Sequence, residues 1–302
     1  MTTTERLAIR LMIAQGVMFA AETALIHQMG SQSSVMLLAL LRGAGGVVLA
    51  IALARNIGFA VIRTCQLPLQ LLRGTVSLLY LWVMIYSFAN LPLADATAIS
   101  YTQTAYIAVF SLLILGETVS RSRWGAAALG NLGALLIAKP TFAGWSSAYV
   151  VALLGTGLNG LSFVLNRYLQ RKDSEATTMF YSSLIALLGN LPVLPVTGLP
   201  AAGILLWLPG LLLIGPIGVY LGIVAAKDAP AAMLGPYTQL RLIIALLAGA
   251  MIFREVPDIF SALGAVLILA SCMVASWAGT GTRMPLIGPA RTQHLLSIAS
   301  FR

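Results

Sequence analysis

The sequence predicts an all-α integral membrane protein in which ten helices cross a bilayer. Three observations support this prediction: the apolar composition, ten apolar stretches of spanning length, and the placement of the basic residues between them. Of the 302 residues, 59% are hydrophobic and only 9% are charged, a balance that is foreign to water-soluble domains. The chain is therefore expected to place most of its surface in lipid.

The ten apolar stretches follow one another along the whole chain. A helix that crosses the hydrocarbon core needs about 20 mainly apolar residues. Stretches of this kind cover residues 7–29, 34–54, 68–89, 92–115, 122–138, 146–169, 175–197, 204–226, 230–253 and 257–277. We therefore expect each of them to form one transmembrane helix.

The basic residues collect in every other gap between these spans. Cytoplasmic loops retain Lys and Arg, and only Lys139 and Arg254 lie in the opposite gaps. Thirteen of the 18 basic residues precede the first span, lie at the end of an even-numbered span or follow the tenth: Arg6, Arg10, Arg55, Arg63, Arg121, Arg123, Arg167, Arg171, Lys172, Lys227, Arg283, Arg291 and Arg302. This alternation predicts a multi-pass protein of the bacterial inner membrane with both termini in the cytoplasm.

The two halves of the chain share a spaced pattern. Pro92 opens the fourth span and Glu117 follows 25 residues later, while Pro230 opens the ninth span and Glu255 again follows 25 residues later. The pattern divides the chain into five-helix repeats over residues 1–142 and 143–277, followed by a flexible basic cytoplasmic tail over 278–302. Because five crossings are an odd number, the second repeat is expected to be inverted, as in carriers that open a central site to each side in turn.

Several motifs resemble the EamA domains of the drug/metabolite transporter superfamily, over residues 5–277. These motifs are Leu115, Gly116 and Glu117 with Trp124, Gly125, Ala126 and Ala127, their counterparts Phe253, Arg254, Glu255, Gly264 and Ala265, and the pair Leu41 and Arg42. Within the superfamily, residues 72–106, with Arg73, Gly74, Tyr80, Trp82 and Tyr101, are most similar to bacterial amino-acid exporters of the YddG type. The resemblance implies a ten-helix basket around a central cavity and export of amino acids, aromatic ones included. Arg254 replaces the Gly that usually precedes the second Glu, which implies a differently built loop.

Ionisable residues inside the predicted spans are candidates for function, because each costs about 2.5 to 3.5 kcal/mol at mid-helix. Glu22 and Arg42 lie at a similar depth, about 10 to 12 Å below the outer ends of their helices. They are expected to be partners, either as a structural ion pair or as a gate or proton-coupling pair. Arg73 lies near the cytoplasmic end of its span and is expected to extend toward the headgroups.

Arg241 lies near the middle of the ninth span with no acidic residue at its depth. Tyr237 precedes it by four residues, so both side chains share a face of an α-helix. A guanidinium beside a phenol can hold the carboxylate that every free amino acid carries. The alternative is that Arg241 binds backbone carbonyls freed at a helix bend.

Aromatic and polar residues near mid-depth predict the lining of a cavity. Five aromatic residues lie too deep in spans three and four for an interfacial belt: Tyr80, Trp82, Tyr86, Tyr101 and Tyr106. The predicted substrate site combines some of them with residues of spans four, six and nine, namely Tyr80, Met84, Tyr101, Gln103, Asn159, Phe163, Tyr237 and Arg241. For any one polar residue, helix packing is the alternative role.

Glycine and proline residues interrupt spans eight and nine inside the bilayer. They are Gly215, Pro216, Gly218, Gly222, Gly235 and Pro236. Such positions permit kinks, and bending there is expected to close one side of the cavity while the other side opens. The alternative is that these small residues only permit close helix packing.

The sequence also argues against several functions. The histidines His27 and His294 lie far apart along the chain, as do Cys65 and Cys272, so we expect no metal site, and no nucleotide-binding loop or other cofactor motif is present. The net charge of +9 is assigned to topology and the lipid bilayer rather than to nucleic acid, and no protein partner is implied. A pore would need rings of like charge, which the sequence lacks.

The function predicted from the sequence is that of a secondary transporter. It would export amino acids, aromatic and other apolar ones, or related small metabolites by alternating access. The first alternative is a drug/metabolite carrier for a different solute, and the second is a membrane-embedded lipid-modifying enzyme with Glu22 or His27 as acid or base. Proton coupling and downhill flux are both open from the sequence.

Overall fold

The computed structural model describes residues 2–29, 34–54, 61–142, 146–197, 207–252 and 258–277. The expected tail over 278–302, and the repeat motif at Phe253, Arg254 and Glu255, lie outside these residues. Within the described ranges the regular structure is entirely helical. This agrees with the predicted all-α class.

Each of the ten predicted spans corresponds to helix in the described part of the chain, although three are divided by local changes of backbone geometry. The elements are α1 (Thr3–Met29), α2 (Val35–Leu53), α3 (Leu67–Asn90), α4 (Leu93–Tyr101) with α5 (Gln103–Phe110) and η3 (Ser111–Leu115), α6 (Arg121–Ala138), α7 (Ser147–Leu169), α8 (Glu175–Asn190) with η4 (Leu191–Val193) and α9 (Leu194–Thr197), α10 (Leu208–Asp228), α11 (Ala231–Leu234) with η6 (Gly235–Gln239) and α12 (Leu240–Ile252), and α13 (Ile259–Trp277).

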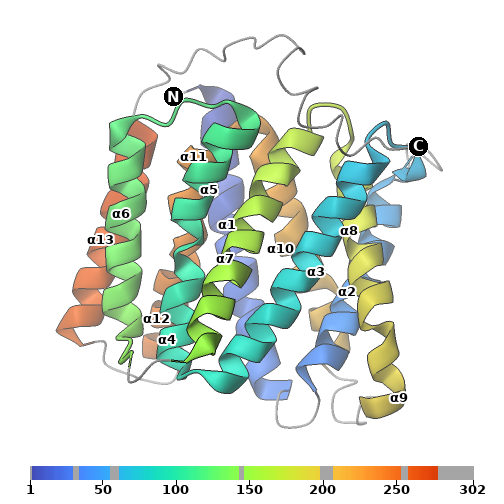
Figure 1. Ribbon diagram of the computed structural model, residues 1–302, viewed down its shortest axis with the longest axis horizontal. Coiled ribbons are helices and arrows are strands. Elements are labelled where there is room, and N and C mark those ends of the chain that lie inside the picture. Colours follow the sequence, from blue (N-terminus) through green and yellow to red (C-terminus); the bar gives the residue numbers. More distant parts are fainter. Residues whose placement is uncertain are drawn as a thin grey trace.

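Seven of these stretches are long and apolar enough to cross a membrane: α1, α2, α3, the α4–η3 segment, α7, α10 and α13. Of the others, α6 begins with Arg121 and includes Arg123, α8 is only 16 residues long, and α11 and α12 are separated by η6. All of them stand side by side with the seven in one bundle (Figure 1). The chain therefore forms a multi-pass membrane protein.

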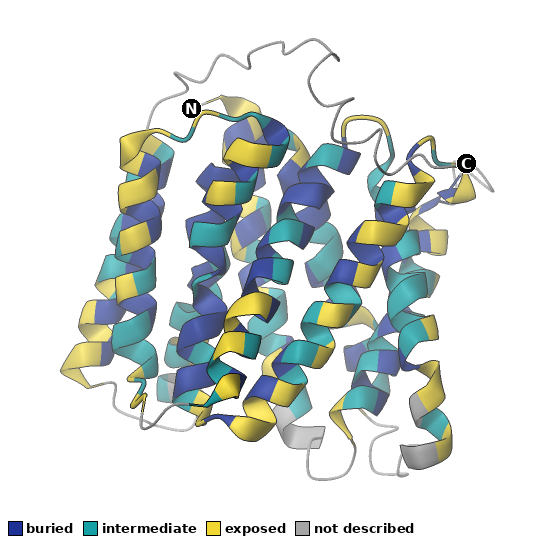
Figure 2. Ribbon diagram, in the orientation of Figure 1, coloured by how far each residue is buried: buried dark blue, intermediate teal, exposed yellow. Residues whose placement is uncertain are grey.

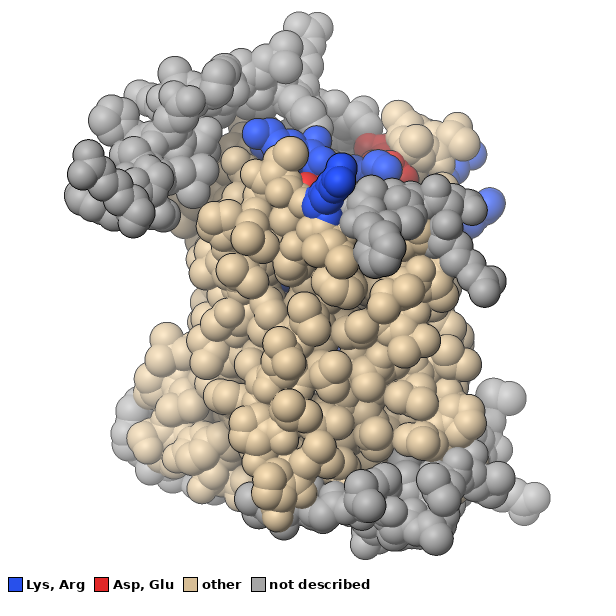
Figure 3. Space-filling model, turned by 90° about the vertical axis from the view of Figure 1, so that its right-hand side faces the viewer, with Lys and Arg blue, Asp and Glu red and all other residues tan. Residues whose placement is uncertain are grey.

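The outer surface of the bundle is apolar. Exposed residues lie on the outward faces of α6 and α13, and buried residues face inward (Figure 2). Figure 3 shows a broad face without charge, with the visible Lys, Arg, Asp and Glu side chains gathered at one end. This end, where α1 begins and α6 starts with Arg121, is called the basic end below. A broad surface without charged side chains is what the hydrocarbon core of a bilayer requires.

Close pairs of helices build the bundle. Helix α1 packs on α10, α3 on α7, α2 on α8, and α6 on α13. Gly133 and Gly264 let α6 and α13 approach closely, because a Cβ on either would lie 2.6 Å from the carbonyl oxygen of the other. At the far end of this pair, Lys139 Nζ lies 2.5 Å from Asp258 Oδ2, and its hydrogen bond lowers the pKa of Asp258, which precedes α13, to about 2.

Gly45 is where α2 meets α10, and its replacement by valine is expected to destabilise the protein by about 1 to 3 kcal/mol. A Cβ there would lie 2.7 Å from the carbonyl carbon of Leu212, and backbone cannot move aside as a flexible side chain can. Thermal unfolding in detergent measures the loss. The matched control is Gly125→Ala on α6, where an added Cβ meets nothing within 4 Å and stability should rise slightly. Equal stability of the two variants would contradict the prediction.

Candidate functional site

A cavity of about 550 Å³ lies at the centre of the bundle. Helices α1, α2, α3, α7 and α10 and the η6–α12 segment contribute most of its wall. Of the residues expected in the substrate site, gate or hinges, the wall contains Tyr80, Met84, Gln103, Asn159, Phe163, Tyr237, Arg241, Glu22, Arg42, Pro216 and Gly222. A volume of this size suits a small organic solute.

One face of α3 and one face of α7 form neighbouring parts of this wall. The cavity-facing residues of α3 recur at helical spacing: Arg73, Ser77, Tyr80, Met84 and Phe88. Those of α7 do the same: Asn159, Ser162, Phe163 and Asn166. The hydroxyls of Ser77 and Ser162 are 2.6 Å apart and join the two faces. The wall therefore combines aromatic surface with hydrogen-bonding groups.

Arg241, at the start of α12, presents a guanidinium to the cavity. Its Nε donates a hydrogen bond to Tyr101 Oη at 2.9 Å, and its Cζ lies 4.9 Å from the centroid of the same ring. Tyr80 is a second phenol neighbour of the guanidinium. Tyr101 is buried and supports Arg241 without bordering the cavity itself. The partners described for Arg241 are thus phenols, not the backbone carbonyls of a bent helix.

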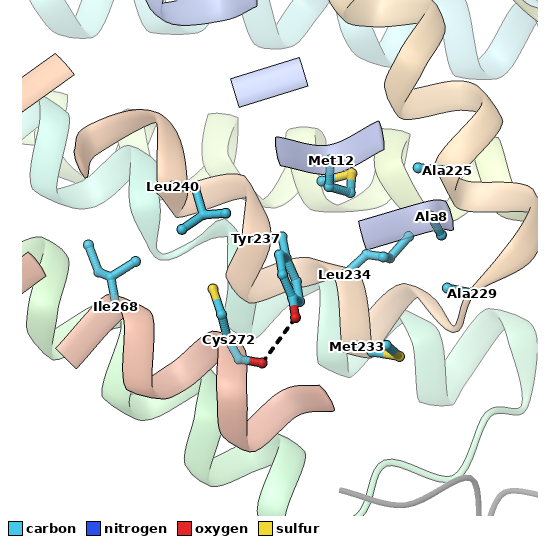
Figure 4. Packing of buried hydrophobic residues seen from close by; sticks show 10 residues of the cluster. All are labelled: Ala8, Met12, Ala225, Ala229, Met233, Leu234, Tyr237, Leu240, Ile268 and Cys272. Carbon is cyan, nitrogen blue, oxygen red and sulfur yellow. Dashed lines mark hydrogen bonds between the residues drawn. The ribbon is translucent and has the colours of Figure 1, made fainter. Parts of the chain in front are cut away.

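Tyr237 borders the cavity but does not join Arg241, so the expected pairing of these two side chains is wrong. Its hydroxyl donates to the carbonyl oxygen of Cys272 on α13 at 3.2 Å, as Figure 4 shows, and also contacts the Ser276 hydroxyl. The i, i+4 rule assumes α-helical geometry, whereas Gly235–Gln239 forms a 3₁₀ turn with three residues per turn. Tyr237 is instead part of the core between α1 and α13.

Amide side chains hold the η6 turn against α5 and α6. Gln103 donates to Thr238 Oγ1 at 2.8 Å and accepts a hydrogen bond from Asn159. Gln239, fully buried, donates to Asn131 Oδ1 at 2.9 Å and to Thr104 Oγ1 at 3.1 Å. The predicted residues Gln103 and Asn159 therefore meet each other, and these contacts fix the start of α12 and with it Arg241.

Glu22 and Arg42 form an ion pair in the cavity wall, with Nε of Arg42 3.0 Å from Oε1 of Glu22. The Glu22 side chain is 5% exposed and that of Arg42 34%. Arg42 also lies over the ring of Phe19, 5.5 Å from its centroid. The sequence prediction missed Phe19 and Gln15, although both follow the helical spacing that leads to Glu22 on the same face of α1.

The predicted hinge residues occupy two different settings. Helix α10 is continuous from Leu208 to Asp228 through Pro216, and its glycines receive side chains of α1. A Cβ would lie 2.6 Å from the Glu22 carboxyl carbon at Gly215, 2.8 Å from the Phe19 ring at Gly218 and 2.9 Å from the Gln15 amide carbon at Gly222. Gly235 and Pro236 instead begin the 3₁₀ turn that separates α11 from α12. Bending at these residues remains a proposal.

Four of the five mid-depth aromatic residues do not line the cavity, so this expectation is wrong for them: Tyr101, which lies behind Arg241, and Trp82, Tyr86 and Tyr106. Trp82 and Tyr86 are 39% and 46% exposed on the outside of the bundle. They lie about 200° around α3 from Tyr80 and Met84, which face inward. Tyr106 stacks on Phe110 and packs against Gly157 and Gly160. Position along each span predicted the depth of these residues in the membrane, but not whether their side chains face the cavity or the outside of the bundle.

Arg73 was expected to extend toward the headgroups, and this expectation is wrong. It is 5% exposed, lines the cavity, and its Nε has no hydrogen-bond partner in the described part of the chain. Its position on α3, seven residues before Tyr80 and on the same face, directs it inward. Its depth in the span led to the wrong prediction, whereas its seven-residue spacing from Tyr80 would have predicted a side chain that faces the cavity.

A buried ion pair closes the bundle at the basic end. Gly116, with φ of 66°, ends the π-helical turn η3 in the left-handed conformation and turns the chain so that Glu117 Oε2 accepts from Ser111 Oγ at 2.7 Å. Oε1 of Glu117 lies 2.5 Å from Nε of Arg167 on α7, and Oε2 also accepts from the backbone N–H of Ala231 at 3.2 Å. Arg167 donates in turn to the carbonyl oxygen of Ala226 on α10 at 2.9 Å.

The cavity is open at the end opposite to this ion pair. Lining residues Thr23, Val35 and Phe88, near the junction of α1 with α2 and the end of α3, are exposed. Lining residues toward the basic end, such as Met12 and Arg73, are buried. The structure therefore shows the central site accessible from one side of the bundle and closed on the other.

The chain is similar to known membrane transporters in sequence and to a solved structure in fold. The model of the EamA-like transporter family matches residues 6–139 and again 146–277. A solved crystal structure superposes with a TM-score of 0.77 over 94% of this chain and 99% of the other, at 20% sequence identity. At that identity the superposition shows the shared fold alone.

Three curated relatives are transporters of different solutes. The pseudopaline exporter of Pseudomonas aeruginosa is 28% identical over 263 residues, which cover 85% of this chain and 92% of the relative. The riboflavin transporter of Brucella anthropi is 27% identical, with coverage of 78% and 86%, and the S-adenosylmethionine uptake transporter of Rickettsia felis is 24% identical, with coverage of 69% and 71%.

The family and these names describe transporters of small molecules rather than enzymes, so the lipid-modifying enzyme is set aside. The matched family covers most of the chain, in both halves. It agrees with the apolar helical bundle and with the central cavity. The chain belongs to the EamA-like transporter family.

Proposed function

We propose that the protein is a secondary transporter that exports amino acids or related small metabolites across the bacterial inner membrane. The observation that supports this most is Arg241 in the central cavity, held by Tyr101 and Tyr80 and without an acidic partner among the described residues. A fixed guanidinium with free donors is suited to a substrate carboxylate. The adjoining Tyr80 and Phe163 offer flat apolar surface for a side chain.

The proposed architecture has ten transmembrane helices in two inverted repeats, residues 1–142 and 143–277. The helix pairs support it. Between the two repeats, α1 corresponds to α7, α2 to α8, α3 to α10 and α6 to α13. Exchanging the repeats therefore converts the pair α1 with α10 into the pair α7 with α3, and it leaves the pairs α2 with α8 and α6 with α13 unchanged. Such an exchange would convert a cavity open at one end into a cavity open at the other. This is the basis on which we propose alternating access.

The proposed orientation places the basic end, and both termini, in the cytoplasm. Cytoplasmic loops retain Arg and Lys, and the described basic residues Arg121, Arg171 and Lys227 lie at that end. The cavity then faces the periplasm, and the ion pair of Glu117 with Arg167 closes the cytoplasmic side. An exporter in this state would be ready to release its solute.

A drug/metabolite carrier for a different solute is the second candidate. The relative named for riboflavin favours it, since riboflavin is not an amino acid. A YddG-type amino-acid exporter remains our first proposal because of the Arg241 site. The two candidates differ in the solute and share the fold.

The proposal is tested by efflux from proteoliposomes preloaded with radiolabelled amino acids, riboflavin or S-adenosylmethionine. We expect saturable efflux of amino acids, faster than from protein-free liposomes. Flux of riboflavin or S-adenosylmethionine without any amino-acid flux would replace the first candidate by the second. Imposing a pH gradient in the same experiment tells proton-coupled from downhill transport.

A further inference from the structure

Two arginines in the cavity wall have no acidic partner among the described residues. The four ion pairs that these residues form use Arg42, Lys139, Arg167 and Lys227. Arg73 and Arg241 take part in none of them, yet both line the cavity. Since Glu22 neutralises Arg42, the central cavity has two uncompensated positive charges.

The surroundings of Arg73 are polar and incompletely hydrogen-bonded. Contacts between α3 and α7 fix their register: Ser77 Oγ meets Ser162 Oγ at 2.6 Å, and Gln66 Nε2 donates to Leu169 O at 3.4 Å. This register places Arg73 opposite Asn166. Asn166 also lines the cavity, and its Oδ1, like Nε of Arg73, is buried without a partner in the described part of the protein.

Unsatisfied buried groups of this kind cost free energy unless a ligand completes them. Arg73 is 5% exposed and Asn166 8%, so water at the surface does not serve them. The guanidinium supplies charge-assisted donors, whereas the Ser77 hydroxyl donates to the carbonyl oxygen of Arg73 at 3.0 Å and pairs with the Ser162 hydroxyl. An anionic group entering from the cavity would satisfy the guanidinium.

The position of Arg73 is separate from that of Arg241. Arg73 precedes Tyr80 by two helical turns, about 10 Å along α3, and Tyr80 is the phenol that neighbours Arg241. A single carboxylate bound at Arg241 therefore does not reach Arg73. The two arginines are at two depths of one cavity.

We infer that the cavity binds a substrate with two anionic groups, one at Arg241 and a second at a subsite formed by the guanidinium of Arg73, opposite Asn166. This inference rests on the proposed function and narrows its substrate class from amino acids in general to amino acids or amino-acid conjugates that carry a second carboxylate. A cationic solute is disfavoured by the same charges.

The inference is tested by titrating the purified protein in detergent with two matched series of probes. The first series is L-glutamate, L-2-aminoadipate, L-2-aminopimelate and L-2-aminosuberate, and the second contains the ω-amide of each. For the diacid of best length, wild type is expected to bind about tenfold more tightly than it binds the amide, because a charge-assisted hydrogen bond is lost in the amide.

Variants at position 73 assign the difference to the subsite. Arg73→Gln is expected to weaken binding of the diacid about tenfold more than binding of the amide and so to remove the preference for the diacid, while Arg73→Lys restores part of the preference. The control is Arg121→Gln, since Arg121 is exposed on α6 and should behave as wild type. Because the wild-type comparison needs no variant, the test stands even where Arg73→Gln does not fold.

Three other binding results would overturn the inference, and one of them would also overturn the proposed function. Equal binding of diacids and amides by wild type overturns this inference and leaves the proposed function intact. Equal weakening of both series by Arg73→Gln also overturns it, because Arg73 would then act on the structure rather than on a second anion. Absence of binding and of flux for every amino acid and diacid overturns the proposed function and this inference with it.

Discussion

Arg241→Ala is expected to lower transport at least about thirtyfold while the protein stays folded. Removing one partner of a buried, hydrogen-bonded charge pair costs about 2 to 5 kcal/mol, and the substrate carboxylate would be that partner. Tyr101, which contacts Nε of Arg241 at 2.9 Å, remains in place but supplies no charge. Initial efflux rates at subsaturating substrate measure the loss.

Two controls make this result specific. Arg241→Lys keeps the charge but loses the planar donors and the contact with the Tyr101 ring, so an intermediate rate is expected. Arg121→Ala, at an exposed position on α6, should transport as wild type does. Unchanged transport by Arg241→Ala would remove Arg241 from the substrate site and favour a structural role.

Glu117→Ala is expected to destabilise the protein by about 3 to 5 kcal/mol, since breaking a buried ion pair leaves an uncompensated charge. The side chains of Glu117 and Arg167 are 11% and 8% exposed. One carboxylate joins η3, α7 and α11, so its loss also weakens the closed side of the cavity. Thermal unfolding in detergent, with and without Arg167→Ala, gives the coupling between the two residues.

The same variant should make the cavity accessible from the basic end. In a Cys65→Ser background, a cysteine at Ser182, which lines the cavity and is 7% exposed, reports access to a membrane-impermeant thiol reagent. Faster labelling in inside-out vesicles on Glu117→Ala is expected. Lys139→Ala, which breaks an exposed pair at the other end, is the matched control and should leave that rate unchanged. A loss of stability without a change in labelling would assign Glu117 to folding alone.

Periodicity predicted much of this site because it is a local property of the chain. The faces of α3 and α7 follow from the spacing of Tyr80 with Met84 and of Asn159 with Phe163, since α-helical geometry repeats regularly. Basic residues and apolar length likewise indicated the helices. These signals require no knowledge of which helices are neighbours.

The errors arose where the backbone departs from the α-helix or where partners are distant in sequence. Tyr237 lies four residues before Arg241, but the 3₁₀ turn η6 moves it to a different face. Tyr101, the actual partner, lies 140 residues away. Glu117 was recognised as a repeat marker, yet its contact with Arg167 depends on how α7 packs beside η3, which no local pattern encodes.

The proline in α10 has a consequence for the membrane as a solvent. Pro216 has no N–H, so the carbonyl of Leu212, four residues earlier, lacks its usual intrahelical hydrogen bond. Gly45 of α2 lies directly against that carbonyl, and a Cα–H group is the weak donor available there. The dipole left by the proline is thus covered by protein instead of facing hydrocarbon, where an unsatisfied carbonyl is not tolerated. A missing backbone hydrogen bond that lipid would not tolerate is therefore permitted inside α10, because the free carbonyl faces α2 rather than the bilayer.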